Sequence, residues 1–204
     1  MSVQSVKHKP ITIGLTGGIA SGKTTAVNYF KQFNLPVIDC DQIVKELWKH
    51  NKEMIHKAES LFEFSIKTDE DLAKIASIIF SQSKKREKLN HIVHPYVFKE
   101  IENQKEHLLE EPLIIIDMPL LIEVKYMNHV DYVCLVYVDL ETQIERLMKR
   151  DGLTKEDALK RINSQMPLEQ KRTYADYIFD NSNSQNYLYH QMDMFLGGIM
   201  NEKQ

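Results

Sequence analysis

Cysteine is scarce in this sequence. Only Cys40 and Cys134 occur among its 204 residues, and both lie in apolar, strand-like stretches. No spacing resembles that of a zinc site, and two thiols cannot build the disulfide framework of a small secreted domain. We therefore expect both cysteines to be buried and reduced rather than joined in a disulfide.

Long apolar runs and an excess of basic charge are also absent. The longest apolar runs are as long as a strand, far below the roughly 20 residues of a membrane-spanning helix. Residues 1–10 are polar and basic, without the apolar segment of a secretory signal. The net charge is −3, so no overall basic field would gather nucleic acid. We expect a cytoplasmic protein that binds neither membranes nor nucleic acid; the oligomeric state stays open, with a monomer favoured.

Short β-branched runs alternate with segments of helical period, which is the pattern of a parallel sheet covered by helices. The expected strands are residues 11–16, 36–39, 113–116, 132–138 and 177–179. Residues 42–111 contain no obvious strand and predict a helical lobe that binds a substrate. We expect a single domain over residues 1–204, with a core (about 10–41, 112–139 and 173–204), this lobe (about 42–111) and a lid (about 140–172).

A glycine-rich segment follows the first expected strand. Residues 17–24 fit the pattern G-x-x-x-x-G-K-[ST] at every fixed position. In such a loop, backbone N–H groups and the positive end of the following helix hold the phosphates of a nucleotide. Lys23 is expected to reach the β- and γ-phosphates, and the Thr24 hydroxyl to ligate Mg²⁺. The alternative is a glycine-rich turn with an incidental lysine.

This loop makes the predicted fold class α/β, with a parallel sheet of the P-loop NTPase type flanked by helices, a helical insertion and an arginine-bearing lid. The loop residues expected to contact ATP are Gly18, Ile19, Ala20, Ser21, Gly22, Lys23, Thr24 and Thr25. Ala20 stands where a third glycine would be more permissive, so we expect its backbone to keep a negative φ.

Two aspartates close the second expected strand, at the sheet edge where ligands bind in open α/β folds. The alternation of a strand would put Asp39 and Asp41 on the same side, facing the γ-phosphate. One could then accept a proton from an acceptor hydroxyl, and the other could hold Mg²⁺ through water. The alternative is that Asp39 caps a helix beginning near Gln42.

Other charged residues are weaker candidates. Asp117 ends a strand and is a further candidate metal ligand, or else a turn residue before Pro119; the role of Glu123 is less defined. Arg146 and Arg150 share a helical face ahead of Asp151-Gly152, which predicts a hinged lid whose arginines neutralise transferring charge. The alternative is a solvated helix with Glu145 and Asp157 as partners. By spacing alone, His94-Pro95 reads as a helix end or turn.

In the order of its motifs, the chain resembles the dephospho-CoA kinase family from Ile13 to about Leu196. The matching segments are 14–25 (the opening motif), 37–41 (V-I-D-x-D), 94–95 (H-P), 119–123 (P-L-L-x-E), Arg146 with Arg150, and Gln165 with 175–178 and Asn181 (Q…A-D-x-I…N). Two departures occur. Leu72 stands where many members carry arginine, so a cationic contact to the acceptor is either missing or supplied by Lys74 instead, and Thr24 replaces the commoner serine.

The resemblance implies transfer of phosphate from ATP to the ribose 3′-hydroxyl of dephospho-CoA, the last step of coenzyme A biosynthesis, with Mg²⁺ as cofactor. It implies Asp41 as the base, contacts of Thr16 and His94 with the acceptor, and a contact of Asn181 with ATP. Lys23 and the lid arginines would stabilise the transferring group. The alternatives are another small-molecule or nucleotide kinase and a GTPase-like switch, although the N-K-x-D tetrapeptide of the latter is absent. A nucleic-acid-processing ATPase is disfavoured by the acidic balance and short length.

Overall fold

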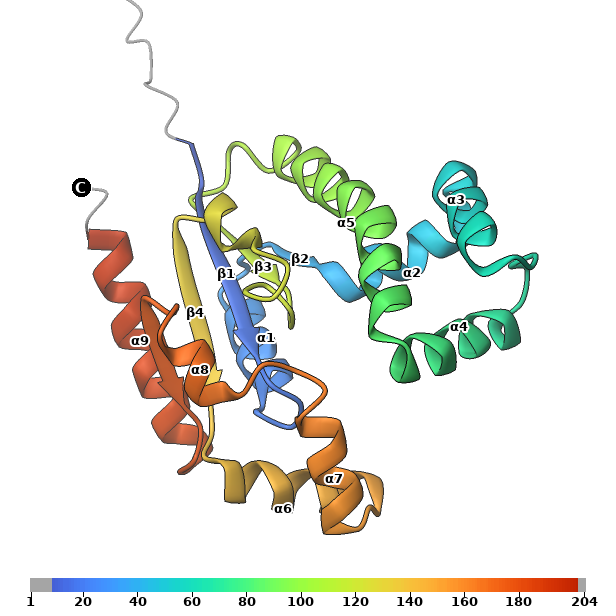
Figure 1. The fold of residues 1–204 in the computed structure, drawn as a ribbon. Helices are drawn as coiled ribbons and strands as arrows, with labels where there is room; N and C mark the ends of the chain where they lie inside the picture. The colour runs from blue at the N-terminus through green and yellow to red at the C-terminus, as the bar shows by residue number, and fades with distance from the viewer. Residues whose placement is uncertain (1–8, 202–204) are drawn as a thin grey trace, which may run out of the picture. The chain divides into compact units, whose positions relative to one another are not determined.

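The computed structural model describes residues 9–201 (Figure 1). The chain divides into two compact units, one made of the residues up to Ile38 together with those from Leu108 onward, and the other of Asp39–His107. The predicted α/β class is confirmed. The finer partition into core, lobe and lid stays a prediction, although the second unit begins and ends within a few residues of the expected helical lobe.

In the described part of the chain, the sheet has five strands in the order β2-β3-β1-β4-β5. They are β1 (Ile11–Gly17), β2 (Val37–Asp39), β3 (Leu113–Asp117), β4 (Tyr132–Tyr137) and β5 (Tyr177–Asp180). β1 pairs in parallel with both β3 and β4, and β4 pairs in parallel with β5. The carboxyl ends of β1 and β3 therefore meet at one edge of the sheet, where Leu15 lies opposite Asp117.

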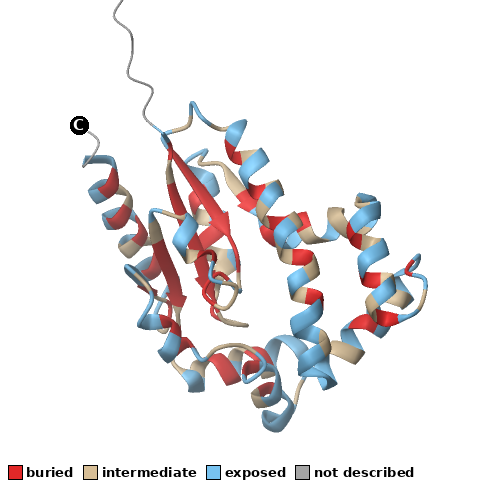
Figure 2. Ribbon diagram, turned by 45° about the horizontal axis from the view of Figure 1, so that its top comes forward, coloured by how far each residue is buried: buried red, intermediate tan, exposed pale blue. Residues whose placement is uncertain are grey.

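The central strands are buried because their apolar residues pack on both faces, as parallel sheets require (Figure 2). Ile13 and Leu15 of β1 belong to a core cluster with residues of α1 (Lys23–Gln32) and α9 (Gln185–Asn201). On the opposite face, a β-carbon added to Gly14 would lie 2.7 Å from the Leu121 side chain. The segment after β3 therefore packs directly on β1, and this close approach requires glycine.

Three short helices follow β4. α6 (Leu140–Asp151) and α7 (Lys155–Ile162) are separated by Gly152, whose φ of 66° lies in the left-handed region, and α8 (Leu168–Arg172) comes next. Thr154 caps α7, since its hydroxyl accepts a hydrogen bond from the Asp157 N–H at 3.2 Å. Ile144 and Leu147 of α6 pack with α7 in a small cluster that also contacts Ile19 of the glycine loop. A single 3₁₀ turn, η1 (Tyr126–His129), precedes β4.

The second unit is helical, as the sequence predicts. It comprises α2 (Cys40–His50), α3 (Lys52–Phe62), α4 (Asp69–Ser81) and α5 (Ser83–Glu106). The prediction that His94-Pro95 marks a helix end or turn is wrong, because α5 runs through Pro95. Proline removes one backbone hydrogen bond, but Val93 and Val97 on either side of it are buried and α5 packs against the three other helices. Tertiary packing therefore outweighs the local preference.

Both cysteines are buried and neither is joined in a disulfide. Within the described residues, no helix combines the length and the apolar character needed to cross a bilayer.

Candidate nucleotide-binding site

The glycine loop joins the end of β1 to the start of α1. Inside the loop, the Ser21 N–H donates to the Gly18 carbonyl at 3.1 Å, and the Thr25 N–H donates to the Gly22 carbonyl at 2.9 Å. Gly22 is the residue before the helix and has a φ of 92°. A β-carbon at this position would lie 2.1 Å from the Asn181 amide nitrogen, so only glycine fits there.

The expectation of a negative φ at Ala20 is wrong, because its φ is 59°. The left-handed conformation costs an L-residue roughly 1–2 kcal/mol. The neighbouring peptide groups show what imposes it. The Gln143 amide donates to the Ile19 carbonyl at 2.7 Å, and the Gln165 amide oxygen accepts from the Ile19 N–H at 3.1 Å. Both backbone groups of Ile19 are thus held by side chains from outside the loop.

Gln143 is a residue that sequence reasoning missed. It is buried in α6, with 3% of its surface exposed, and nothing in a lone helical glutamine signals a contact to a loop 124 residues away. Gln165 belongs to a motif of the family resemblance, and the structure gives that motif a physical role. The two amides together fix the conformation of the phosphate loop.

Asn181 follows β5 and supports the loop from behind. Its buried side chain donates to the Ser21 carbonyl at 2.9 Å, and its own backbone carbonyl accepts from Arg146 Nη2 at 2.8 Å. The structure therefore brings Asn181 and Arg146 together beside the loop. Contacts of either residue with ATP stay predictions.

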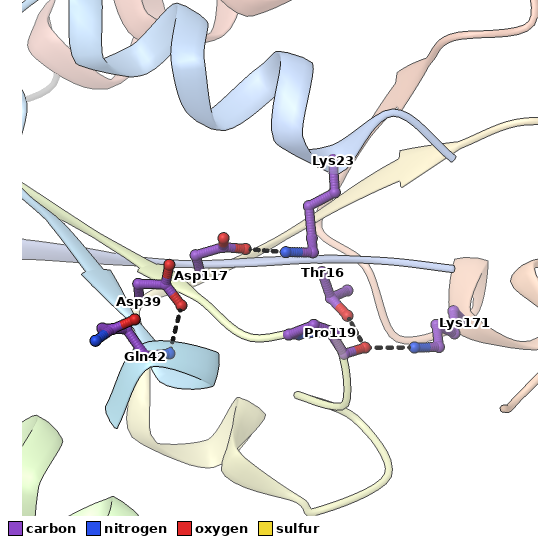
Figure 3. Close-up of polar contacts among 7 residues, drawn as sticks. All are labelled: Thr16, Lys23, Asp39, Gln42, Asp117, Pro119 and Lys171. Carbon is purple, nitrogen blue, oxygen red and sulfur yellow. Dashed lines mark hydrogen bonds and ion pairs between the residues drawn. The ribbon is translucent and has the colours of Figure 1, made fainter. Parts of the chain in front are cut away.

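Lys23, the first residue of α1, forms an ion pair with the carboxylate of Asp117 at the end of β3 (Figure 3). Both side chains are largely buried, with exposed fractions of 14% for Lys23 and 11% for Asp117. The alternative of an incidental lysine in a glycine-rich turn does not explain a pair at the sheet edge. Asp117 is placed to set the position of the lysine that would meet a nucleotide's phosphates.

The expected alternation of Asp39 and Asp41 is wrong, because β2 ends at Asp39 and α2 begins at Cys40. Asp39 is the N-cap of α2, where its carboxylate accepts a hydrogen bond from the Gln42 N–H at 2.9 Å (Figure 3). Asp41 lies in the first turn of the helix, and both aspartates are exposed. The capping alternative therefore describes Asp39 in this structure, while the metal role of Asp39 and the base role of Asp41 stay predictions.

His94 lies in the middle of α5, half-buried, with its ring stacked on Phe98 at a centroid distance of 5.8 Å. Burial lowers the pKa of His94, and the nearby His91 lowers it further. The side chain is therefore biased toward the neutral form, which can both donate and accept a hydrogen bond. Its contact with an acceptor stays a prediction.

Arg150 is exposed at the end of α6. Its Nε and Nη2 donate to the two carboxylate oxygens of Asp151 at 2.7 and 3.1 Å, and Arg161 Nη1 donates to Asp151 Oδ2 at 2.8 Å. The solvated alternative named other partners, Glu145 and Asp157, for these arginines. The observed pairing joins the ends of α6 and α7 across Gly152, and a lid motion there stays a prediction.

Thr16 is fully buried, and its hydroxyl donates to the Pro119 carbonyl at 2.9 Å (Figure 3). In this structure Thr16 supports the segment after β3, and its predicted contact with the acceptor is untested. The same carbonyl accepts from Lys171 Nζ at 2.7 Å. Lys171 was missed by the sequence reasoning, because a lysine in a short polar helix shows no sign of burial.

A magnesium site would draw on few protein ligands here. Within residues 9–201 no group of three or more His, Cys, Asp or Glu side chains is arranged to hold a metal. Mg²⁺ bound with a nucleotide normally takes one or two protein oxygens together with phosphates and waters. Within the first unit, the exposed hydroxyl of Thr24 at the start of α1 and the carboxylate of Asp117 are oxygen donors of the required hard type. The donor set therefore fits Mg²⁺ carried by ATP.

These features define the class of protein. A parallel sheet whose first strand leads through a glycine loop into a helix beginning with lysine is the framework of P-loop phosphotransferases. Comparison with known proteins then gives the family. The profile described as "Dephospho-CoA kinase" matches residues 11–186, and the chain belongs to the dephospho-CoA kinase family.

The alignments with similar proteins span most of this chain and most of each relative. A dephospho-CoA kinase of Bacillus anthracis is 42% identical over 176 residues, which span 84% of this chain and 88% of that protein. One of Arabidopsis thaliana is 39% identical over 189 residues, spanning 90% and 82%. Among solved structures, a dephospho-CoA kinase from Campylobacter jejuni superposes with a TM-score of 0.59 at 25% identity, covering 92% of this chain and 96% of that one. A Thermus thermophilus crystal structure gives 0.80 at 30% identity, covering 94% and 98%.

Proposed function

We propose that this chain transfers the γ-phosphoryl group of ATP to the ribose 3′-hydroxyl of dephospho-CoA, giving ADP and coenzyme A in the final step of coenzyme A biosynthesis. The observation that carries the proposal is the phosphate loop, with Lys23 paired to Asp117 at the sheet edge, in a chain of the dephospho-CoA kinase family. The reaction would take place in the cytoplasm and involve neither nucleic acid nor membrane, with the protein acting as a monomer.

The loop supplies the electrostatic part of the reaction. Backbone N–H groups of Gly22 and of the first turn of α1 would bind the phosphates, and the helix N-terminus would add a favourable dipole. In the complex with ATP, the Lys23 ammonium would interact with the β- and γ-phosphates as well as with Asp117. Thr24, with Asp117 or Asp39, would hold Mg²⁺, which neutralises charge on the β- and γ-oxygens when it is bound.

The acceptor side of the reaction is assigned through the family resemblance. Asp41 would accept the proton of the 3′-hydroxyl, a contribution of about 10² to 10⁴ in rate. His94, in its neutral form, would bind the acceptor. Arg146 and Arg150 would stabilise the charge of the transferring group once the lid closes, which would also exclude water.

An assay of ADP release tests the proposal. The protein is incubated with Mg·ATP and either dephospho-CoA, no acceptor, shikimate, a nucleoside or a nucleoside monophosphate. We expect ADP release well above the blank with dephospho-CoA alone. Faster release with another acceptor would instead support the alternative of a different small-molecule kinase, and preference for GTP without any acceptor would support a nucleotide switch.

A further inference from the structure

Lys171 in α8 is the most deeply buried charged side chain among the described residues, with none of its surface exposed. An ammonium group is rarely removed from water without a compensating partner, because the loss of hydration is costly. Burial lowers the pKa of Lys171, the carboxylate of Glu123 opposes this shift, and the charge of Lys23 adds to it. The buried lysine is therefore electrostatically coupled to the phosphate-loop lysine.

Lys171 binds the segment that follows β3 at two points. Its Nζ donates to the Pro119 carbonyl at 2.7 Å and pairs with Glu123 Oε1 at 2.9 Å. The Thr16 hydroxyl donates to the same Pro119 carbonyl at 2.9 Å. Three parts of the first unit thus meet at one oxygen atom: the end of β1, the segment after β3, and α8 (Figure 3).

The segment held in this way begins directly after Asp117, the last residue of β3. Pro119 lies two residues after Asp117, and the chain from residue 118 to 125 contains only turns. Backbone hydrogen bonds such as Leu121 N–H to the Met118 carbonyl (3.2 Å) keep it compact. Because proline has no N–H, its carbonyl is the only backbone hydrogen-bonding group that Pro119 offers. The contacts to that carbonyl, together with the hydrogen bond from the Met118 N–H to the Leu15 carbonyl (3.0 Å), hold the segment where it leaves the sheet edge.

Stabilisation of the fold does not by itself explain the Lys171–Glu123 ion pair. Glu123 Oε2 is buried and makes no hydrogen bond within the described part of the chain, and an unsatisfied buried acceptor is destabilising. Buried ion pairs can often be replaced by apolar residues of similar volume without loss of stability. What an apolar pair could not supply is a donor to the Pro119 carbonyl.

We propose that Lys171 is a positioning residue for phosphoryl transfer: its ammonium fixes the Pro119 carbonyl and Glu123, and through this segment it holds Asp117 in register with Lys23. The proposal deepens the proposed function and rests on it. The ammonium of Lys171 contacts the Pro119 carbonyl and the Glu123 carboxylate, both of which follow Asp117 in the chain. It acts through the backbone between Asp117 and Glu123.

The test separates positioning from stability with two variants. Lys171→Met leaves the largely buried Glu123 carboxylate with only the hydrogen bond from the Met166 N–H and without a cation, and should lower both stability and kcat. Lys171→Met/Glu123→Leu removes both charges, and should recover the urea midpoint of the wild type. Since a small misplacement of catalytic groups can cost about 100-fold in rate, we expect kcat to stay up to about 100-fold low in the double variant, with KM for dephospho-CoA little changed.

A matched control is Lys105→Met, in α5. Lys105 is also nearly buried, at 9% exposure, and pairs with Glu102 at 3.0 Å, so its loss should lower the urea midpoint while kcat stays near the wild-type value. Recovery of wild-type kcat in the double variant, or an unchanged kcat in Lys171→Met, would overturn the proposal. Absence of wild-type turnover with dephospho-CoA would instead overturn the proposed function. In that case the affinity for Mg·ATP, measured by calorimetry in the wild type and the variants, still tests the role of Lys171. This affinity depends on the phosphate loop and does not require an acceptor.

Discussion

Lys23 and Asp117 are joined in an ion pair that links the first residue of α1 to the last residue of β3. The two strands that bring them together, β1 and β3, are neighbours in the sheet. The lysine of the phosphate loop is thereby held at a defined position by the sheet itself. This relationship makes the phosphate loop a prepared site rather than a flexible turn.

Replacement of Lys23 by Met should reduce kcat by about 10² to 10³, the usual cost of removing one preorganised donor from a developing charge. The variant should also lose stability, because it breaks an ion pair whose two side chains are only 14% and 11% exposed. Steady-state kinetics and urea unfolding measure the two effects. Lys160→Met is the control, since Lys160 forms exposed pairs with Glu156 and Asp157 that are worth little. A Lys23→Met enzyme with nearly full kcat would remove the loop from the mechanism.

Gly22→Ala should disrupt the phosphate loop for two reasons. The left-handed φ of 92° costs an L-residue about 1–2 kcal/mol, and the new methyl group would displace the Asn181 amide that holds Ser21. We expect Mg·ATP affinity, measured by calorimetry, to fall about tenfold or more, which is ~1.4 kcal/mol. Gly197→Ala in α9 meets no atom within 4 Å and should raise stability slightly with unchanged affinity. Equal affinities in the two variants would contradict this assignment.

The class of fold and the loop could be predicted from sequence because both depend on local signals. Apolar runs such as residues 113–116 can satisfy their environment only as buried strands, and the loop requires glycine and lysine at fixed spacing. Gly22 illustrates the point, since its left-handed φ of 92° favours glycine. The five expected strands occur within one or two residues of their predicted bounds.

What the sequence could not show depends on contacts between distant residues. The positive φ of Ala20 is imposed by Gln143 and Gln165, which are remote in the chain. Lys171 can be buried because its ammonium contacts the Pro119 carbonyl and the Glu123 carboxylate. The hydrophobic periodicity of the sequence gives no sign of these contacts. The alternation argument for the acidic pair failed because a helix begins at Cys40, directly after β2 ends at Asp39, so that Asp41 is helical.

Asp41→Asn should fold and bind Mg·ATP like the wild type but lose turnover by about 10² to 10⁴, since the amide cannot accept the proton of the hydroxyl. Asparagine is tolerated in the first helical turn, so stability should change little. Glu46→Gln is the control and should keep its activity, since Glu46 lies on the same helix with 46% of its side chain exposed. Single-turnover kinetics separates the chemical step from binding, and a wild-type rate in Asp41→Asn would rule out this base.

Acid should destabilise the protein partly through His94. Its pKa is lowered in the folded state, so the unfolded state binds the proton more readily, and stability is lost as pH falls through the ordinary histidine pKa. Between about pH 8 and about pH 5, His94→Gln should therefore lose less unfolding free energy than the wild type. The exposed His190→Gln should behave like the wild type. Identical acid sensitivity in all three proteins would show that His94 is not the group responsible.

The most direct measurement is transfer of labelled phosphate. The protein is incubated with Mg²⁺, dephospho-CoA and ATP carrying ¹⁸O in its γ-phosphoryl group. The products are then separated, and their masses are measured by mass spectrometry. The account predicts coenzyme A with the label in its 3′-phosphate, formed only when the acceptor is present and strongly reduced in Lys23→Met. Label found solely in inorganic phosphate, or dephospho-CoA recovered unchanged while ATP binds, would contradict it.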